Sequence, residues 1–361
     1  MFKKMYTSSV VRISIFISIL YFWCGNCANS TTPVSPTNKV IMATPTIVAR
    51  STFDANKDSV AINKCISSKD IRGVALILAS RTDKQRQQIK ISYQQNYATS
   101  LEQELQGKTK KTFERLMNAL LQPLPEFLAR QIGWSLDQEK NWEYMSIICT
   151  SSGQMINQFV AQYFTAYNKR LWDDLGSYLN DPNGINFLRA VIDSTSTNVT
   201  APMRTNPTVR QSSIANQMTF FPRDYGRCYE VDNQLLFGFM STESFAQIKA
   251  VVEAFQKANT LSVAGLINTY CFYDLREAYS RIVRFSVDPA AYWANEIYES
   301  MAGKQTDDRA LTLAILSRSE IDLATIRDTF GVLYHQPLQK AIQDRCSGTY
   351  QEIMIQIVNG N

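Results

Sequence analysis

The stretch TDDRALTLAILSRSEIDLATI, residues 306–326, decides the fold of this chain. Thr306 and the two aspartates after it predict the start of a helix, because hydroxyl and carboxylate oxygens accept hydrogen bonds from the free N–H groups of a first turn. Ser319 together with Asp322 predicts the start of a second helix shortly after the first one ends. The stretch therefore predicts two helices joined by a tight corner.

The residues on either side extend this pattern to a unit of about five short helices. Asp288 followed by Pro289 predicts an earlier helix, since an acidic cap and a proline at the first helical position are typical of helix starts. Pro337 predicts the start of a fourth helix, and Gly348 separates a fifth. Apolar side chains recur at helical spacing, which indicates that one face of each helix packs into a core.

The unit recurs along the chain. When Ser80 is placed on Ser317, further similar side chains coincide without a gap: Ile89 with Ile326, Tyr93 with Phe330, Tyr97 with Tyr334 and Leu101 with Leu338. A second copy aligns on the same positions through Phe159, Tyr163, Tyr167 and Leu171, and a third, weaker copy through Ile248 and Val252. We interpret these matched positions as core residues. Four units are therefore predicted, at residues 53–123, 124–194, 223–286 and 287–361.

Two segments lie outside these units. Residues 29–52 are rich in Ser, Thr and Pro and lack helical periodicity, so we expect a flexible linker. Residues 195–222 are polar and interrupted by proline, which predicts a long surface connector. Since the rest of the chain has few strand-like alternations, the sequence predicts an all-α protein.

The N-terminus is typical of a secretory leader. Lys3, Lys4 and Arg12 precede the apolar run Ile13–Cys24, which is short for a membrane span and typical of a signal-peptide core. We expect residues 1–28 to be a signal peptide that is removed, so that the mature chain is secreted. An uncleaved membrane anchor is the alternative.

The cysteine count follows from this interpretation. Cys24 and Cys27 fall in the leader and receive no metal or redox role, which leaves five: Cys65, Cys149, Cys228, Cys271 and Cys346. An odd number means that at least one thiol is free or pairs with another chain. We expect these residues to be small core side chains in a fold that needs no disulfide. Asn29 and Asn198 begin sequons that would be glycosylation candidates in a secreted chain.

Charge and composition exclude several classes of function. The formal net charge is +5, and without the three bases of the leader the chain is nearly neutral, which argues against a nucleic-acid binder that works through bulk charge. His335 is the only histidine, so the chain has too few histidines for a histidine-rich metal site and offers a single one to a catalytic triad. No phosphate-cradling glycine-rich motif is present. We therefore expect a binding protein and not an enzyme.

Two parts of the chain resemble a known family. MAGKQTDDRALTLAILSRSEIDLATI (residues 301–326), followed by GTYQEIMIQIV (348–358), resembles the fourth repeat of an annexin. ILASRTDKQRQQI (77–89), followed by LMNALLQP (116–123), resembles the first. The resemblance extends over residues 53–358 and is fair in the second unit and loose in the third. It implies a curved, disc-like all-α protein that docks on acidic phospholipid through calcium ions.

The resemblance also implies a position for calcium. In the family, a loop between the first two helices of a repeat, with the pattern Met-Lys-Gly-any-Gly-Thr, turns backbone carbonyls outward. A carboxylate at the end of the fourth helix completes the oxygen cage. The fourth unit is nearest to this pattern and implies a degenerate calcium site at five residues: Met301, Gly303, Gln305, Thr306 and Asp344.

The chain departs from that pattern in every unit. In the fourth, Gln305 replaces a glycine and Arg345 takes the carboxylate position, so a guanidinium would repel the divalent ion unless the helix end shifts to present Asp344. Lys108 takes the carboxylate position in the first unit and Tyr178 in the second, and no acid lies near residues 267–269 in the third. None of the four sites is intact.

Basic side chains are predicted on the former calcium face instead: Lys108, Arg223, Arg227, Lys304 and Arg345. The sequence thus favours a secreted annexin-like protein that binds acidic phospholipid membranes peripherally, with or without calcium. Direct contact with lipid phosphate would come from these cations. The alternative is an extracellular interaction or effector protein that keeps the fold, has lost calcium binding and binds a protein partner, for example of a host.

Overall fold

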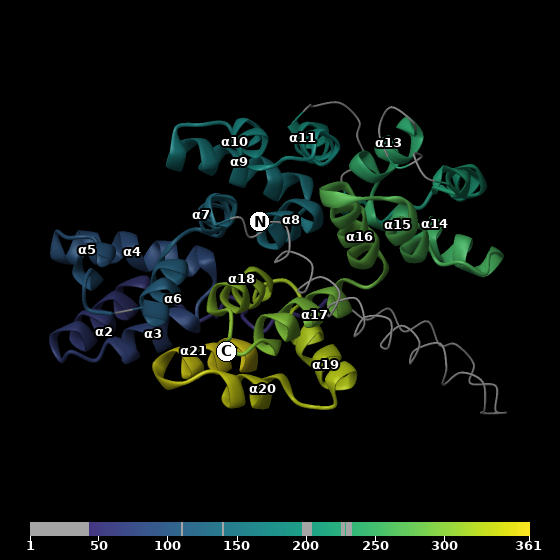
Figure 1. Cartoon of the computed structure of the whole chain (residues 1–361). Helices are drawn as coiled ribbons and strands as arrows, with labels where there is room; N and C mark the ends of the chain where they lie inside the picture. Colours follow the sequence, from purple (N-terminus) through teal and green to yellow (C-terminus); the bar gives the residue numbers. More distant parts are fainter. Residues whose placement is uncertain (1–42, 110, 139–140, 197–203, 225–227, 229–232) are drawn as a thin grey trace. The chain divides into compact units, whose positions relative to one another are not determined.

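A computed structural model describes residues 43–109, 111–138, 141–196, 204–224, 228 and 233–361 (Figure 1). Every regular element in these residues is helical, and no strand occurs among them. The all-α class and the repeated helical architecture predicted from the sequence are thereby confirmed. The predicted signal peptide and most of the predicted linker lie outside the described residues. Within the described part, no helix combines the length and apolarity needed to cross a membrane.

The helices follow one another in four groups. The first contains α2 (Ala55–Ser67), α3 (Ile71–Ala79), α4 (Asp83–Tyr97), α5 (Leu101–Leu105) and α6 (Lys111–Leu121). The second contains α7 (Leu124–Asp137), α8 (Asn141–Thr150), α9 (Gly153–Tyr167), α10 (Leu171–Tyr178) and α11 (Pro182–Ser196). The third contains the short turns η1 (Gln211–Ser213), α12 (Ile214–Gln217) and η2 (Met218–Phe220), then α13 (Gln234–Thr242), α14 (Phe245–Ala258), α15 (Val263–Tyr270) and α16 (Tyr273–Val287). The fourth contains α17 (Pro289–Ala302), α18 (Asp308–Arg318), α19 (Leu323–Tyr334), α20 (Leu338–Arg345) and α21 (Gly348–Asn359).

The stretch that decides the fold forms α18, a corner and α19, with two differences from expectation. Asp307, and not Thr306, caps α18, because its carboxylate accepts a hydrogen bond from the Ala310 N–H at 3.2 Å. Ser319 ends α18, and α19 begins only after Asp322. The carboxylate of Asp322 pairs with Arg318 at 2.6 Å across the corner, so it does not cap the next helix.

Equivalent aromatic pairs confirm the repeat register. Tyr93 and Tyr97 in α4 have ring centroids 4.7 Å apart and an interplanar angle of 49°. Tyr163 and Tyr167 in α9 repeat this arrangement at 4.7 Å and 42°, and Phe330 and Tyr334 in α19 at 4.8 Å and 49°. The first ring of each pair is buried. The positions of these first rings are therefore core positions, as predicted, whereas Tyr167 at the second position is 37% exposed.

The third group departs from the other three. Its first helix is replaced by the short turns at residues 211–220, which pack against α14. These turns lie inside the predicted connector, which is thus partly helical. Arg204, also in that segment, is buried and donates hydrogen bonds to the carbonyls of Ser241 at 3.0 Å and Cys149 at 3.2 Å. The connector is anchored between the second and third groups, and its boundaries remain predictions.

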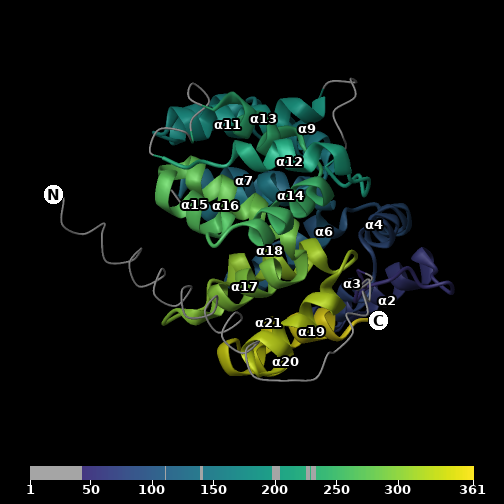
Figure 2. The same cartoon turned by 90° about the vertical axis from the view of Figure 1, so that its right-hand side faces the viewer.

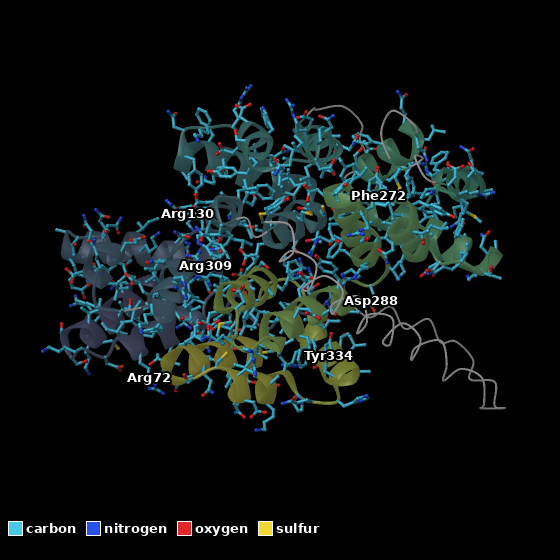
Figure 3. The ribbon with its side chains drawn as sticks, in the orientation of Figure 1. Arg72, Arg130, Phe272, Asp288, Arg309 and Tyr334 are labelled. Carbon is cyan, nitrogen blue, oxygen red and sulfur yellow. A yellow bond between two sulfur atoms is a disulfide. The ribbon has the colours of Figure 1, made fainter. Side chains whose placement is uncertain are left out.

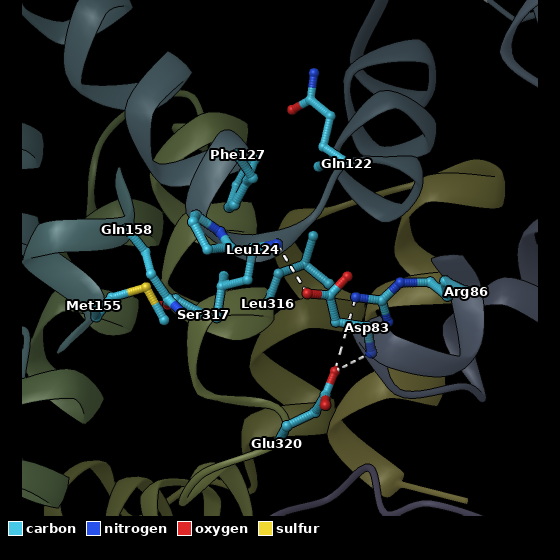
Figure 4. A pocket seen from close by; sticks show the side chains of 12 residues that line it. Asp83, Arg86, Gln122, Leu124, Phe127, Met155, Gln158, Leu316, Ser317 and Glu320 are labelled. Carbon is cyan, nitrogen blue, oxygen red and sulfur yellow. Dashed lines mark hydrogen bonds and ion pairs between the residues drawn. The ribbon is translucent and has the colours of Figure 1, made fainter. Parts of the chain in front are cut away.

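The first and fourth groups are joined directly. Helix α21 lies beside α3 (Figure 2), where the Gln356 side chain donates to the Leu76 carbonyl at 2.9 Å. Residues preceding α2 also contact the corner after α18, since the Thr46 N–H donates to the Ser319 carbonyl at 2.9 Å. Close by, the Asp83 N–H donates to Glu320 at 2.6 Å and the Asp83 carboxylate accepts from the Leu124 N–H at 3.0 Å (Figure 4).

Candidate functional site

Two loops of the fourth repeat meet around an open hollow of about 460 Å³. One is the loop between α17 and α18, which contains Gly303 and is closed by a hydrogen bond of 2.7 Å from the Asp307 N–H to the Ser300 carbonyl. The other is the corner between α20 and α21. The hollow is lined by Thr112, Lys304, Gln305, Thr306, Asp308, Asp344, Arg345, Cys346, Ser347 and Tyr350.

Arg345 ties these two loops together. It is the last residue of α20, and its Nη2 donates a hydrogen bond to the carbonyl oxygen of Gly303. The Arg345 carbonyl in turn accepts a hydrogen bond from the Thr306 hydroxyl at 3.0 Å. A guanidinium therefore lies against a loop carbonyl that the resemblance assigns to a calcium ion.

Asp344 borders the same hollow, but both of its carboxylate oxygens are engaged. Oδ1 pairs with the ammonium group of Lys340, and Oδ2 accepts a hydrogen bond from the Gln336 amide at 3.1 Å. Asp308, the other acid that lines the hollow, accepts a hydrogen bond from the Thr112 hydroxyl at 2.6 Å.

The residues of the fourth repeat do not fit a calcium ion. Calcium takes six to eight oxygen ligands, whereas here Met301 is buried, the Thr306 hydroxyl is used on Arg345 and the Gly303 carbonyl faces a positive charge. Among the residues that the structure describes, no group of three or more His, Cys, Asp or Glu side chains could hold a metal ion. Of the predicted site residues, Gln305, Thr306 and Asp344 line the hollow, and the Gly303 carbonyl accepts a hydrogen bond from Arg345.

In the first repeat, the loop between the first two helices contains an aspartate that caps the second of them. Only three residues, 68–70, separate α2 from α3. The Asp70 carboxylate caps α3 by accepting a hydrogen bond from the Gly73 N–H at 2.8 Å. Lys108 lies beyond the end of α5 and pairs with Glu104 at 3.2 Å. The positive charge of Lys108 is thus partly neutralised by the carboxylate of Glu104.

In the second and third repeats, tyrosines end the fourth helix. Tyr178 is the last residue of α10 and Tyr270 the last residue of α15. Tyr270 follows directly after residues 267–269, near which the third unit has no acid. Arg223 is exposed, while Arg227 lies outside the described residues. Of the four predicted basic residues that the structure describes, Lys304 and Arg345 border the same hollow.

A disulfide joins the two loops of the third repeat. Cys228, which precedes α13, is bonded to Cys271, which follows α15. The expectation that this fold needs no disulfide is therefore wrong for these two residues. The signal in the sequence was the presence of one cysteine in each loop, but spacing alone does not show which cysteines pair.

Three cysteines are free thiols, where the odd count requires at least one: Cys65, Cys149 and Cys346. Burial raises the pKa of Cys149 and of Cys346 to about 11. Neither is a thiolate at neutral pH, so neither is an activated nucleophile. His335 follows the last residue of α19 and caps this helix with a left-handed backbone (φ 53°).

Comparison with known proteins points to one family. The family model described as Annexin matches residues 69–120 and 292–357, which lie in the first and fourth repeats. Annexin B10 of Drosophila melanogaster is 29% identical over 317 residues, covering 86% of this chain and 96% of its own length. Annexin A13 of Mus musculus is 27% identical, covering 85% and 96%.

Solved structures agree with this assignment at the level of the fold. Annexin III superposes with a TM-score of 0.79 at 24% identity, covering 89% of this chain and 98% of its own. Calcium-bound annexin (Sm)1 superposes with a TM-score of 0.77 at 19% identity, covering 88% and 93%. The family model, the relatives along most of the chain and the shared fold together support the assignment of this chain to the annexin family.

Proposed function

We propose that this chain is a secreted, peripheral membrane protein that binds acidic phospholipid and does not need calcium in its fourth repeat. The contact between Arg345 and the Gly303 carbonyl carries the proposal. A fixed positive charge occupies the position at which the family would bridge protein and lipid phosphate through calcium. Family membership supports the lipid surface as partner, and the leader at residues 1–28 supports secretion.

Direct contact with phosphate would replace the metal bridge. Lys304 is exposed at the rim of the hollow, and Arg345 presents a guanidinium whose planar fork suits phosphate oxygens. Each basic side chain near an anionic leaflet contributes roughly 1 kcal/mol. Two such residues therefore change affinity by about thirtyfold.

Vesicle co-sedimentation tests this function. The chain should pellet with phosphatidylserine-containing vesicles equally well in calcium and in a calcium chelator, and it should not pellet with phosphatidylcholine alone. The double variant Lys304→Gln/Arg345→Gln should bind about thirtyfold more weakly. A control of the same charge change, Lys84→Gln/Lys257→Gln, alters exposed lysines on α4 and α14 and should bind like the wild type.

Two results would contradict the proposal. Pelleting that requires calcium would mean that another repeat holds the metal. No pelleting under any condition would instead favour the reading as an extracellular protein that recognises a protein partner.

A further inference from the structure

The corner between α15 and α16 presents two neighbouring aromatic side chains to solvent. Tyr273 is 74% exposed and Phe272 is 37% exposed, with ring centroids 6.4 Å apart. Phe272 is labelled in Figure 3. Single exposed apolar residues are common on protein surfaces. Two consecutive exposed rings in one short corner indicate a binding surface more strongly than a single exposed residue does.

The backbone conformation of this corner makes a tyrosine at position 273 energetically unfavourable. Tyr273 has a left-handed backbone (φ 52°), and so do the residues that begin the fifth helix of the first repeat, Lys111 (φ 54°), and of the fourth, Gly348 (φ 64°). Glycine adopts this conformation freely, whereas a residue with a side chain does so at an energetic cost. The fourth repeat shows that glycine fits this position. The third repeat instead keeps a large ring that has little contact with the core.

The corner is fixed from several sides. The disulfide bonds Cys271 to Cys228 in the loop before α13. The Cys271 N–H donates to the Ile267 carbonyl at 2.9 Å, and the Leu275 N–H donates to the Asp181 carboxylate at 3.3 Å. In the fourth repeat the corresponding pair of loops is joined by the guanidinium of Arg345. Both repeats thus use protein groups for a link that the family makes with a metal ion.

We propose that Phe272 and Tyr273 form an aromatic corner that inserts into the interfacial region of a phospholipid bilayer, and that the Cys228–Cys271 disulfide holds it in the inserting conformation. This inference rests on the proposed lipid-binding function and names a second contact for it. Aromatic side chains favour the membrane–water interface because an apolar ring and a polar tip match its two environments. The corner occupies the same place in its repeat as the Arg345-bearing corner in the fourth.

The variant Tyr273→Gly separates this role from a structural one. It removes the ring and relieves the left-handed backbone, so the melting temperature should rise by about 1–2 °C. Affinity for phosphatidylserine-containing vesicles should nevertheless fall about tenfold, while Tyr273→Trp should bind like the wild type. Val332→Ser, which truncates a 74% exposed residue on α19, is the control and should leave affinity unchanged.

The disulfide is tested separately by Cys228→Ser/Cys271→Ser and by mild reduction of the wild type. Both treatments should weaken vesicle binding by a factor similar to that of Tyr273→Gly. Both should leave the helical circular dichroism signal in place. Wild-type affinity in Tyr273→Gly, or in the variant without the disulfide, would overturn the inference. If Lys304→Gln/Arg345→Gln still weakens binding in that case, the proposed function stands. Failure of the wild type to bind any vesicle would overturn both.

Discussion

Arg345 decides how the fourth repeat can interact with its surroundings. Its guanidinium donates a hydrogen bond directly to the Gly303 carbonyl. A calcium ion would have to displace this contact and then share the hollow with a positive charge a few ångströms away, where like charges repel. The adjacent Asp344 does not compensate, because Lys340 and Gln336 engage its oxygens. One side chain thus replaces the metal.

Replacing this arginine by aspartate should create a calcium site. In Arg345→Asp a carboxylate would face the Gly303 carbonyl, so isothermal titration calorimetry should detect calcium binding with a Kd on the order of millimolar, typical of partly built extracellular sites. The wild type should give no heat of binding. Arg345→Gln removes the charge without adding a carboxylate and should also stay silent. Equal calcium binding by wild type and Arg345→Asp would show that the metal binds elsewhere.

Asp274 makes stability depend on pH. Burial, followed by the nearby Asp181 and Glu277 carboxylates, raises its pKa from the ordinary 3.8 to about 6. A carboxyl whose pKa is higher in the folded than in the unfolded state binds more protons when folded. The contribution of Asp274 to the free energy of unfolding therefore becomes more favourable as the pH falls from 7 toward 5.

The variant Asp274→Asn should remove this dependence. At pH 7 it should increase the free energy of unfolding by about 1 kcal/mol, a value reduced for the partial exposure of the group. At pH 5 the difference should fall to about half, because the folded carboxyl is then mostly protonated while the unfolded one, with a pKa of 3.8, is still ionised. The same difference at both pH values would mean that the substitution acts through packing and not through titration.

The helices of the repeats end in a characteristic way. The third helix of three repeats is followed by a residue with a left-handed backbone: Ala98 (φ 57°), Asn168 (φ 52°) and His335 (φ 53°). Asparagine tolerates this conformation better than alanine, and glycine better than both. In the third repeat α14 ends at Asn259 with an extended backbone (φ −133°). The turn after the third helix is therefore a property of the regular repeats.

Glycine at these turns should stabilise the chain in a graded way. Ala98→Gly should raise the free energy of unfolding by about 1 kcal/mol, because alanine bears the larger conformational cost. Asn168→Gly should have a smaller effect. Urea denaturation of both variants measures the order. A destabilised Ala98→Gly variant would mean that added freedom of the unfolded chain outweighs the relief of the turn.

Three repeats meet in one buried polar network. Arg281 of α16 contacts Ser146 of α8 at 2.8 Å, Tyr292 of α17 at 3.0 Å and Glu296 of α17 at 3.2 Å. The side chains of Arg281 and Glu296 are 10% and 8% exposed. A buried ion pair contributes little net stability, but loss of one partner leaves a buried charge without compensation. The network therefore specifies how these helices fit together more than it strengthens them.

Single and double substitutions should separate these effects. Arg281→Ala should lower the free energy of unfolding by about 3 kcal/mol, because Glu296 stays buried and loses its partner. Arg281→Met/Glu296→Met replaces both charges by apolar groups of similar size and should lie within about 1 kcal/mol of the wild type. Urea denaturation of the full chain provides the measurement. A double variant as unstable as Arg281→Ala would show that the network is required for packing.

The sequence by itself determined the features that depend on near neighbours. Caps such as Asp288 and the periodic apolar residues predict helices, since both act within one or two turns. The alignment of Tyr93, Tyr163 and Phe330 set the repeat register that the ring geometry confirms. The departure of Arg345 from the family pattern was also visible in the sequence.

Only the tertiary structure decided which distant groups meet. Arg345 and Gly303 are 42 residues apart, and Cys228 and Cys271 are 43 apart. Local preferences do not fix contacts at such separations, because they depend on how whole helices pack. The same limit applies to the burial of Arg204, which composition alone places in a surface connector. The helices of this protein are determined by residues close together in the sequence, whereas the links between its loops form only once those helices have packed.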